Sequence, residues 1–345
     1  MSLTEEYLMK SLVLKAPSQA EIVRMAQQQE DQDGVLLRVE LVGLCGSDLN
    51  SFRGTNPMVS YPRIPGHEIA ATVVEGAKNI AAGTRVTVTP YSSCGVCTAC
   101  RIGRFNTCRS NQTLGVQRDG ALRELLFVPE EKLFVANLPI KTLCLVEPLT
   151  VGFHAVARGR VTSADVVAVI GCGGVGLGAV AASSYRGART IAVDVSEQKM
   201  EIAKEAGATY TINTSRDDLH TALMKLTDGH GPDVVIEAIG LPQTFRTAVE
   251  EVAFAGRVVY IGYAKELVSY ESRLFVQKEL DILGSRNALP ADFHEVIAML
   301  EAGRFPVEKS ISKIVPLEEA PDALTEWSAD PSRFQKIMVQ VNTNS

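Results

Sequence analysis

Four cysteines in the stretch "SCGVCTACRIGRFNTC" (residues 93–108) form the densest set of potential metal ligands in the sequence. Cys94, Cys97, Cys100 and Cys108 have the spacing C-x2-C-x2-C-x7-C, and four thiolates can surround Zn²⁺ tetrahedrally without leaving an open position. A bacterial iron–sulfur run would instead continue with three residues and then Cys-Pro, and a redox pair would use two thiols rather than four. The spacing predicts a structural zinc lobe over about residues 91–110, with an iron–sulfur cluster and an unmetallated or redox lobe as the alternatives.

A second candidate site is the glycine-rich turn in "VVAVIGCGGVGLGAV". Gly171, Gly173 and Gly176 form G-x-G-x-x-G between a strand-like run and a helical run, and Asp194 ends the next strand-like run. In such a turn the helix N-terminus faces a pyrophosphate and the acid accepts hydrogen bonds from the adenosine ribose. The carboxylate would repel a 2′-phosphate, so the pattern favours NAD over NADP. The alternative is a packing turn followed by a surface aspartate.

The residues expected to contact the dinucleotide fall into three groups. Lys199 is expected near the same ribose as Asp194, where its charge can also weaken the preference for NAD. The segments "EAIGLP" (237–242) and "IGYA" (261–264) end two strand-like runs, where ligands bind in parallel sheets. The expected contacts are Gly171, Gly173, Gly174, Val175 and Gly176 in the turn, Asp194 and Lys199 at the ribose, and Ile239, Ile261 and Gly262 beside the nicotinamide.

A third set of potential ligands is dispersed: "GLCGSD" offers Cys45, Ser47 and Asp48, "PRIPGHE" offers His67 and Glu68, and "LVEPLTVGFHA" offers Glu147. A catalytic zinc site keeps some protein ligands and leaves room for water or substrate. One thiolate, one imidazole and one carboxylate would satisfy that requirement. Taken singly, each residue also has an ordinary explanation, since a cysteine can be a small buried residue and a histidine a satisfied polar group.

Composition excludes several classes of protein. The chain has 345 residues, 46% of them hydrophobic, a formal net charge of −6 and a pI of about 5.5. Without a basic surplus, nucleic-acid binding is not expected. The most apolar stretch, residues 166–182, is shorter than the ~20 residues that span a bilayer. Seven cysteines, an odd number, and no recognisable signal peptide predict a reduced, cytoplasmic protein.

The chain contains two regions with different sequence patterns. Residues 1 to about 150 contain short strand-like runs such as "VLLRVELVGL" and "TRVTVTPY", broken by Gly and Pro. Between about 163 and 286, continuous Val/Ile runs alternate with helical stretches, a pattern typical of a parallel sheet with helices on its faces. Ser196 and Gly207 lie where an N-cap and a C-terminal glycine belong. The tail contains a helical stretch, "ADFHEVIAMLEAG", and a strand-like end, "FQKIMVQV", which we expect to rejoin the first domain.

Together these motifs resemble the zinc-containing medium-chain alcohol dehydrogenases over essentially the whole chain. "CGSD", "GHE", the four-cysteine lobe, "EPLTVGFHA" and "GCGGVG" occur in the order and spacing of that family. Glu68, Glu147 and the segment "GSRNALPADF" are most similar to the polyol and sugar-acid branch, which includes sorbitol, threonine and galactonate dehydrogenases. The resemblance implies an α/β fold with a GroES-like β-rich catalytic domain (1–152 and 287–345), a Rossmann domain (153–286), a cleft between them, and a homodimer or homotetramer.

The resemblance also implies roles for individual residues. Cys45, His67 and Glu68 would bind a catalytic zinc, and Glu147 would be an alternating ligand or would hold the zinc-bound water. Asp48 would orient His67, and Ser47 would take the proton from the substrate hydroxyl. Asn50 stands where many relatives have a histidine, so we expect water to complete the proton relay. Substrate contacts are expected from Phe52, Arg286 and Asn287, with Arg53 as a further pocket residue. For Arg286 and Asn287 the alternative is a contact with the cofactor or packing between the domains.

The sequence thus predicts a dehydrogenase with two zinc ions per chain that oxidises a secondary hydroxyl of a polyol, sugar or sugar acid to a ketone with NAD. The alternatives are an L-threonine or simple alcohol dehydrogenase of the same family, and a non-catalytic, zinc-stapled dinucleotide-binding regulatory protein. A zinc-free NADPH reductase would lack both cysteine-containing sets. His154, His220, His230 and His294 have no partner motif and are expected to be structural or surface residues.

Overall fold

The chain forms two compact units in the computed structural model, which describes residues 8–26 and 34–342. The first unit comprises Met1–Glu147 and Ile311–Ser345, and the second comprises Pro148–Ser310. Among residues 8–26 and 34–342, none of the helices has both the length and the hydropathy that a transmembrane span requires. Because each unit has its own core and sheet, each is described separately.

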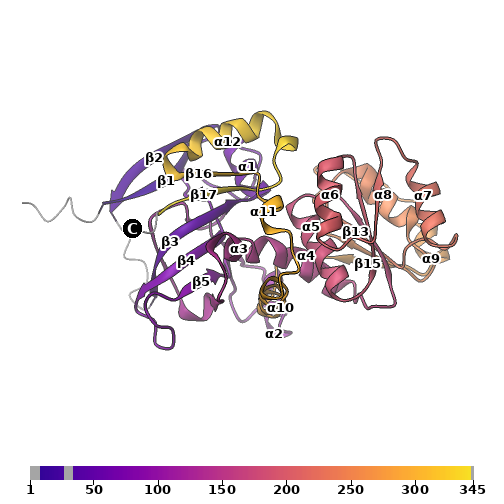
Figure 1. Ribbon diagram of the computed structural model, residues 1–345, viewed down its shortest axis with the longest axis horizontal. Coiled ribbons are helices and arrows are strands. Elements are labelled where there is room, and N and C mark those ends of the chain that lie inside the picture. The colour runs from indigo at the N-terminus through magenta and orange to yellow at the C-terminus, as the bar shows by residue number, and fades with distance from the viewer. Residues whose placement is uncertain (1–7, 27–33, 343–345) are drawn as a thin grey trace, which may run out of the picture. The chain divides into compact units, whose positions relative to one another are not determined.

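The first unit is rich in strands (Figure 1). Its helices are short, and α12 contacts β2 and β16. The elements are β1 (Leu8–Ala16), β2 (Gln19–Ala26), β3 (Val35–Leu44), α1 (Gly46–Phe52), β4 (Glu68–Glu75), β5 (Arg85–Val88), β6 (Tyr91–Ser92), α2 (Thr98–Arg101), β7 (Gln112–Thr113), β8 (Leu125–Val128), β9 (Leu133–Val135), α3 (Ile140–Cys144), β16 (Lys313–Pro316), α12 (Ala320–Ala329) and β17 (Ile337–Gln340).

One seven-stranded sheet organises this unit, in the order β16-β17-β3-β4-β5-β9, with β8 also paired to β3. The central strand β3 pairs antiparallel with β17, β4 and β8. Pairing of β17 with β3 brings the end of the chain back to its beginning, as the strand-like tail predicted. The pairs β1-β2 and β6-β7 form two smaller sheets.

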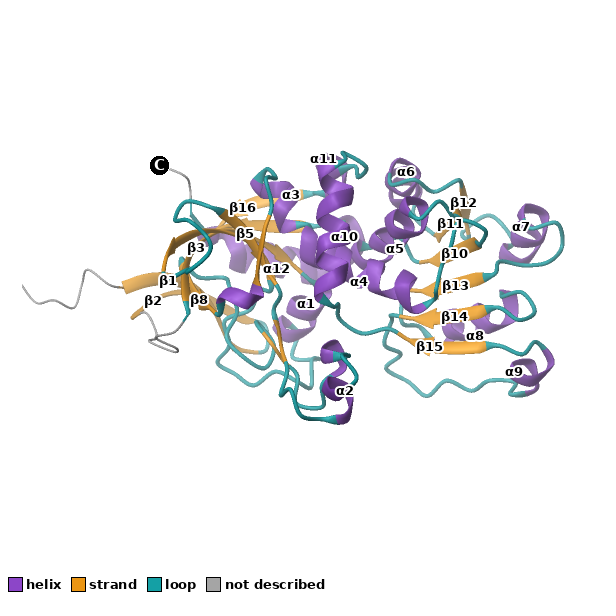
Figure 2. Cartoon of the chain, turned by 90° about the horizontal axis from the view of Figure 1, so that it is seen from below, coloured by secondary structure: helices purple, strands orange, loops and turns teal. Residues whose placement is uncertain are grey.

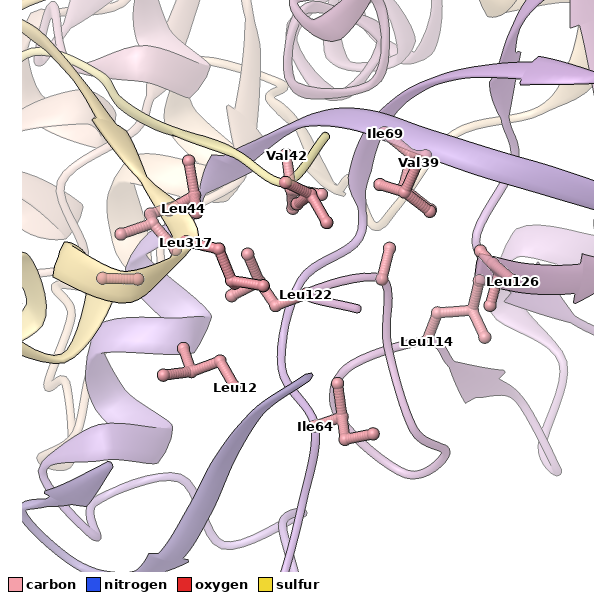
Figure 3. Close-up of a cluster of buried hydrophobic side chains, with 14 of the residues drawn as sticks. Leu12, Val39, Val42, Leu44, Ile64, Ile69, Leu114, Leu122, Leu126 and Leu317 are labelled. Carbon is pink, nitrogen blue, oxygen red and sulfur yellow. The ribbon is translucent and has the colours of Figure 1, made fainter. Parts of the chain in front are cut away.

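The core of the first unit contains alternate residues of β3 and β4 together with side chains from the loops (Figure 3). Leu12, Val39, Ile69 and Leu122 are all 0% exposed. Burial of such side chains stabilises a fold by roughly 1.5–3 kcal/mol each. This packed layer fixes the ends of β3 and β4, where the candidate metal ligands lie.

The second unit alternates strands and helices. Its elements are α4 (Val146–Arg158), which begins at the boundary, β10 (Val166–Ile170), α5 (Gly174–Tyr185), β11 (Arg189–Asp194), α6 (Glu197–Glu205), β12 (Tyr210–Asn213), α7 (Leu219–Leu226), β13 (Val234–Glu237), α8 (Pro242–Glu251), β14 (Arg257–Tyr260), α9 (Arg273–Gln277), β15 (Asp281–Gly284), α10 (Pro290–Glu301) and α11 (Val307–Ser310).

All six strands of the second unit are parallel and follow the order β12-β11-β10-β13-β14-β15 (Figure 2). Helices α5 and α6 cover one face and α7 and α8 the other (Figures 1 and 2). Strand order reverses between β10 and β13, the switch point where dinucleotides bind in doubly wound sheets. The α/β class predicted from the alternating pattern is confirmed.

The boundary between the units differs from the expected one. Residues 287–310, expected in the first domain, pack with the second unit, and the earlier boundary falls at 147/148 instead of 152/153. Two side-chain contacts tie α10 to this unit: His154 Nδ1 lies 2.9 Å from Asp292 Oδ2, and Arg186 NH2 donates to Glu295 Oε2 at 2.8 Å. These partners are more than 100 residues apart, so no local pattern reveals them.

Candidate functional site

The candidate metal site of the first unit begins at the junction of β3 and α1. Cys45 is the N-cap of α1, and its backbone N–H donates to Asp48 Oδ2 at 2.9 Å. The other oxygen of Asp48 accepts from Gly66 N at 3.1 Å. Asp48 therefore ties the loop that carries Cys45 to the residue preceding His67, although the two are far apart in sequence.

His67 and Glu68 enter the site at the start of β4. They are 5% and 1% exposed, respectively, and Glu68 is paired in the sheet with Gly43. A Cβ atom at Gly43 would lie 2.0 Å from Glu68 Oε2, so only glycine leaves room for this carboxylate. The sheet register thus places the imidazole and the carboxylate beside the end of β3.

Three of the four expected ligands converge. One ligand atom from each of Cys45, His67 and Glu68 lies within 4.8 Å of the others, but Glu147 is not part of this group. Glu147 is 3% exposed and its Oε1 accepts a hydrogen bond from the hydroxyl of Tyr91. The structure therefore brings together one thiol, one imidazole and one carboxylate, with a second carboxylate held separately.

Lys336, which sequence reasoning missed, binds Glu68. Its Nζ donates to both carboxylate oxygens at 2.6 Å and to Leu44 O at 3.3 Å, and the residue is 7% exposed. Lysine is rarely this buried without a partner. A lysine inside the apolar run "FQKIMVQV" was the signal available in the sequence.

Charges of both signs surround the site. Burial lowers the pKa of His67, but Asp48, Cys45 and Glu147 outweigh it, so that the pKa lies well above its ordinary value. Burial raises the pKa of Glu147 to about 7, with His67 opposing and Glu68 adding to the shift. Burial, followed by the charge of Glu147, raises the pKa of Tyr91. Buried acids held this close together create an environment that favours a bound cation.

The donor set fits zinc. Thiolate, imidazole and carboxylate are its usual ligands, and their mutual approach within 4.8 Å is compatible with binding one ion. His67 Nδ1 is buried and lacks a hydrogen-bond partner in the described part of the chain, lying 3.7 Å from Asp48 Oδ1. Asp48 is therefore near the ring, as expected for an orienting residue, but at this distance the contact is not a hydrogen bond.

The four-cysteine lobe forms a second potential metal site. The Sγ atoms lie 3.5 Å apart in the pairs Cys97–Cys100 and Cys94–Cys108, and 3.9 Å apart between Cys97 and Cys108. Four sulfurs around zinc, with Zn–S distances of about 2.3 Å, have tetrahedral edges of about 3.8 Å. Hydrogen bonds from backbone N–H groups lower the pKa of Cys97 to about 6, which favours its thiolate. The distances match a tetrahedral cage and are too long for disulfide bonds.

In the second unit, the glycine turn opens α5 at the switch point. Gly171 has a φ of +96°, and a Cβ at Gly176 would lie 1.7 Å from Gly171 O, so both positions require glycine. Gly173 is the N-cap, and Gly173, Gly174 and Val175 are half-buried. The part of the turn formed by these three residues is therefore accessible to a ligand. The N–H groups of the first helical turn have no intrahelical partners and can donate to it.

Asp194 ends β11 next to this turn. Its Oδ2 accepts from Cys172 N at 2.8 Å, and its Oδ1 accepts from Val195 N and Ser196 N at 2.8 and 2.9 Å. Three backbone donors fix the carboxylate in one orientation. Lys199 is half-buried in the following helix, where its N–H faces the N-cap oxygen of Ser196 at 3.4 Å.

The loop after β13 lies against the glycine turn. Glu237 Oε1 accepts from Ile239 N and Gly240 N at 2.9 and 2.8 Å, which fixes the loop. A Cβ at Gly171 would lie 2.5 Å from Ile239 Cγ1, and one at Gly262 would lie 2.4 Å from Gly240 N. These contacts bring the loop carrying Ile239 together with the glycine turn and with the Ile261–Gly262 segment at the carboxyl ends of the strands.

The expected substrate residues divide between the units. Phe52 is 3% exposed and belongs to the hydrophobic core, so it packs the first unit and offers little surface to a ligand. Arg53 binds the backbone and side chain of Ser328 in α12 and serves as a structural link. Arg286 and Asn287 are half-buried after β15, and Asn287 has a φ of +52°, a conformation that asparagine tolerates.

Comparison with known proteins agrees with this architecture. Residues 31–139 match the alcohol dehydrogenase GroES-like domain and residues 174–302 match the zinc-binding dehydrogenase domain. An uncharacterized zinc-type alcohol dehydrogenase-like protein of Haemophilus influenzae is 36% identical over 95% of this chain and 97% of its own. L-galactonate-5-dehydrogenase of Escherichia coli is 32% identical (81% and 84% covered), and sorbitol dehydrogenase of Bacillus subtilis is 31% identical (97% and 98%).

Solved structures show the same fold. The alcohol dehydrogenase RspB of Escherichia coli CFT073, in complex with NADH, has a TM-score of 0.89 at 30% identity, covering 97% of this chain and 100% of its own. A zinc-binding dehydrogenase of Sinorhizobium meliloti, bound to NADP, has a TM-score of 0.90 at 29% identity with the same coverage. The chain therefore belongs to the zinc-type medium-chain alcohol dehydrogenase family, in its polyol branch, with a GroES-like domain and a Rossmann-like parallel sheet, and it is an oxidoreductase.

Proposed function

We propose that this enzyme oxidises a secondary hydroxyl of a polyol, sugar or sugar acid to a ketone and transfers the hydride to NAD. The observation that carries the proposal is the convergence of Cys45, His67 and Glu68 within 4.8 Å in a buried, acidic environment. The relatives named for L-galactonate and sorbitol support this class of substrate. L-Threonine and simple alcohols are the alternative substrates. L-Threonine is included in the assay below because one relative is named L-threonine 3-dehydrogenase.

Cys45, His67 and Glu68 would hold the catalytic zinc, which supplies a Lewis acid that lowers the pKa of the substrate hydroxyl. Ser47 would receive that proton, and the 3.5 Å distance between its Oγ and His67 Nε2 supports this role by keeping the hydroxyl beside the proposed ligands. Asn50 accepts a hydrogen bond from Thr55 at 3.3 Å, and an amide cannot relay a proton as an imidazole does. We therefore expect water to continue the relay beyond Ser47.

The proposed cofactor is NAD. It supplies the hydride acceptor, and Gly171 to Gly176 would receive its pyrophosphate at the start of α5. Asp194, whose carboxylate is fixed by three backbone donors, would accept hydrogen bonds from the hydroxyls of the adenosine ribose. Its negative charge would oppose a 2′-phosphate. The segments holding Ile239, Ile261 and Gly262 would flank the nicotinamide, and Arg286 and Asn287 remain the proposed substrate contacts.

Cys94, Cys97, Cys100 and Cys108 would hold a second, structural zinc, for a total of two ions per chain. Reduced thiols are required at both sites, so we place the protein in the cytoplasm. We also propose a homodimer or homotetramer. Among the described strands, β15 pairs only with β14, leaving an exposed edge on which Ile282 is 40% exposed. Such an edge offers unpaired backbone groups to another chain.

The test combines metal content with turnover. The wild-type protein should contain two zinc ions per chain and should reduce NAD, followed at the NADH absorbance, with some members of a panel of polyols, sugar acids and amino alcohols. Cys45→Ser should lose one zinc ion and its turnover while binding NADH normally. Cys144→Ser is the matched control, because this buried thiol bonds backbone groups, including the carbonyls of Leu41 and Glu68, and is not among the converged ligands. Undiminished turnover in Cys45→Ser would exclude the proposed site.

A further inference from the structure

Tyr91 is not among the expected site residues, yet from the start of the predicted four-cysteine lobe it contacts a carboxylate of the other candidate metal site. It lies in β6, three residues before Cys94, and is 8% exposed. Its hydroxyl donates a hydrogen bond to Glu147 Oε1, and Glu147 is 3% exposed. When Glu147 is ionised, this hydrogen bond is charge-assisted and stronger than one between neutral groups.

The backbone around Tyr91 is fixed from several directions. Tyr91 pairs with Thr113 between β6 and β7, and Leu114 N donates to Pro90 O at 3.0 Å. The ammonium of Lys132 donates to Tyr91 O at 2.7 Å. These bonds hold the main chain at Tyr91, so the side chain that reaches Glu147 starts from a fixed position.

The two carboxylates near the site have different partners. Glu68 is held by the ammonium of Lys336 at 2.6 Å and has an oxygen within 4.8 Å of the ligand atoms of Cys45 and His67. Glu147 lies outside that group, yet it is close enough for its charge to act on His67. The hydroxyl of Tyr91 thus anchors the carboxylate that the converged ligand set does not include.

We propose that Tyr91 is a positioning residue for the catalytic metal site: by holding Glu147 Oε1, it keeps this carboxylate in one orientation beside His67. The inference rests on the proposed function, since it assumes that zinc binds at Cys45, His67 and Glu68. Partners that orient the groups around a metal typically contribute 10–100-fold to metal affinity or activity. Loss of the hydroxyl should therefore weaken metal binding at this site and leave the four-cysteine lobe unchanged.

The experiment uses Tyr91→Phe, which removes one oxygen and keeps the ring. The full-length protein, with the lobe loaded with zinc, is titrated with Co²⁺ against a competing chelator, and the visible spectrum of bound cobalt is recorded. Tyr91→Phe should bind Co²⁺ about 10–100-fold more weakly, with altered absorption bands. Tyr61→Phe is the matched control, because its hydroxyl donates to the backbone oxygen of Ser51, and it should match wild type.

A double-mutant cycle with Glu147→Gln tests whether Tyr91 acts through Glu147. If it does, adding Tyr91→Phe to Glu147→Gln should weaken cobalt binding far less than it does in the wild-type background, because coupled residues are not additive. If Tyr91→Phe had wild-type affinity and spectrum, or if the cycle were fully additive, this inference would be overturned and the proposed function would stand. Wild-type protein that takes up no more cobalt than Cys45→Ser would instead overturn the proposed function.

Discussion

Replacing Lys336 with methionine should destabilise the metal-free protein strongly. Lys336 and Glu68 are 7% and 1% exposed, and the ammonium lies 2.6 Å from both carboxylate oxygens. Removing one partner of a buried ion pair leaves an uncompensated charge, at a cost of about 3–5 kcal/mol. For a protein unit of this size, each kcal/mol corresponds to about 2–4 °C in Tm, so we expect a decrease of about 6–20 °C.

The assay is thermal and urea unfolding of the metal-free protein, with Lys313→Met as the control. Lys313 lies 2.6 Å from Glu326, the same distance, but its side chain is 38% exposed. An exposed pair contributes little to stability, so this control should unfold much like wild type. If Lys336→Met and Lys313→Met unfolded at the same temperature, the reasoning from burial would be refuted.

Zinc provides a second comparison for the same variant. A cation bound at Glu68 neutralises the carboxylate that Lys336→Met leaves unpaired. The difference in Tm between wild type and variant should therefore be smaller with saturating zinc than without metal. An equal difference under both conditions would argue against Glu68 as a metal ligand.

Two further predictions concern Glu147 and Asp194. Because the folded-state pKa of Glu147 is raised to about 7 from an ordinary 4.5, the folded chain binds this proton more tightly than the unfolded chain. Metal-free protein should therefore lose stability as the pH rises from about 4.5 to 7, and Glu147→Gln should lack this contribution. Urea midpoints at pH 5 and pH 8 measure it, and a variant that parallels wild type would contradict it. Asp194→Ala should weaken NAD binding by about 10–100-fold, as expected for losing hydrogen bonds to a charged group, and should raise the ratio of kcat/KM for NADP to that for NAD; an unchanged ratio would remove Asp194 from cofactor selection.

The sequence by itself determined the features whose signals lie close together in the chain. The strand, glycine turn and helix around Gly171–Gly176, the acid Asp194 and the N-cap Ser196 form a continuous segment, and each reports on backbone conformation nearby. The four-cysteine spacing is equally local, because all four potential ligands lie in the single stretch from Cys94 to Cys108. Side-chain periodicity and turn chemistry act over this range, so a single sequence is enough to predict them.

Only the tertiary structure decided how distant residues meet. Lys336 reaches Glu68 because β17 pairs with β3 while β4 pairs with the other edge of β3, and the two residues are 268 positions apart. Tyr91 reaches Glu147 across 56 positions. Phe52 packs in the core and residues 287–310 join the second unit for the same reason. Such contacts depend on sheet register and packing, which local patterns in the chain do not encode.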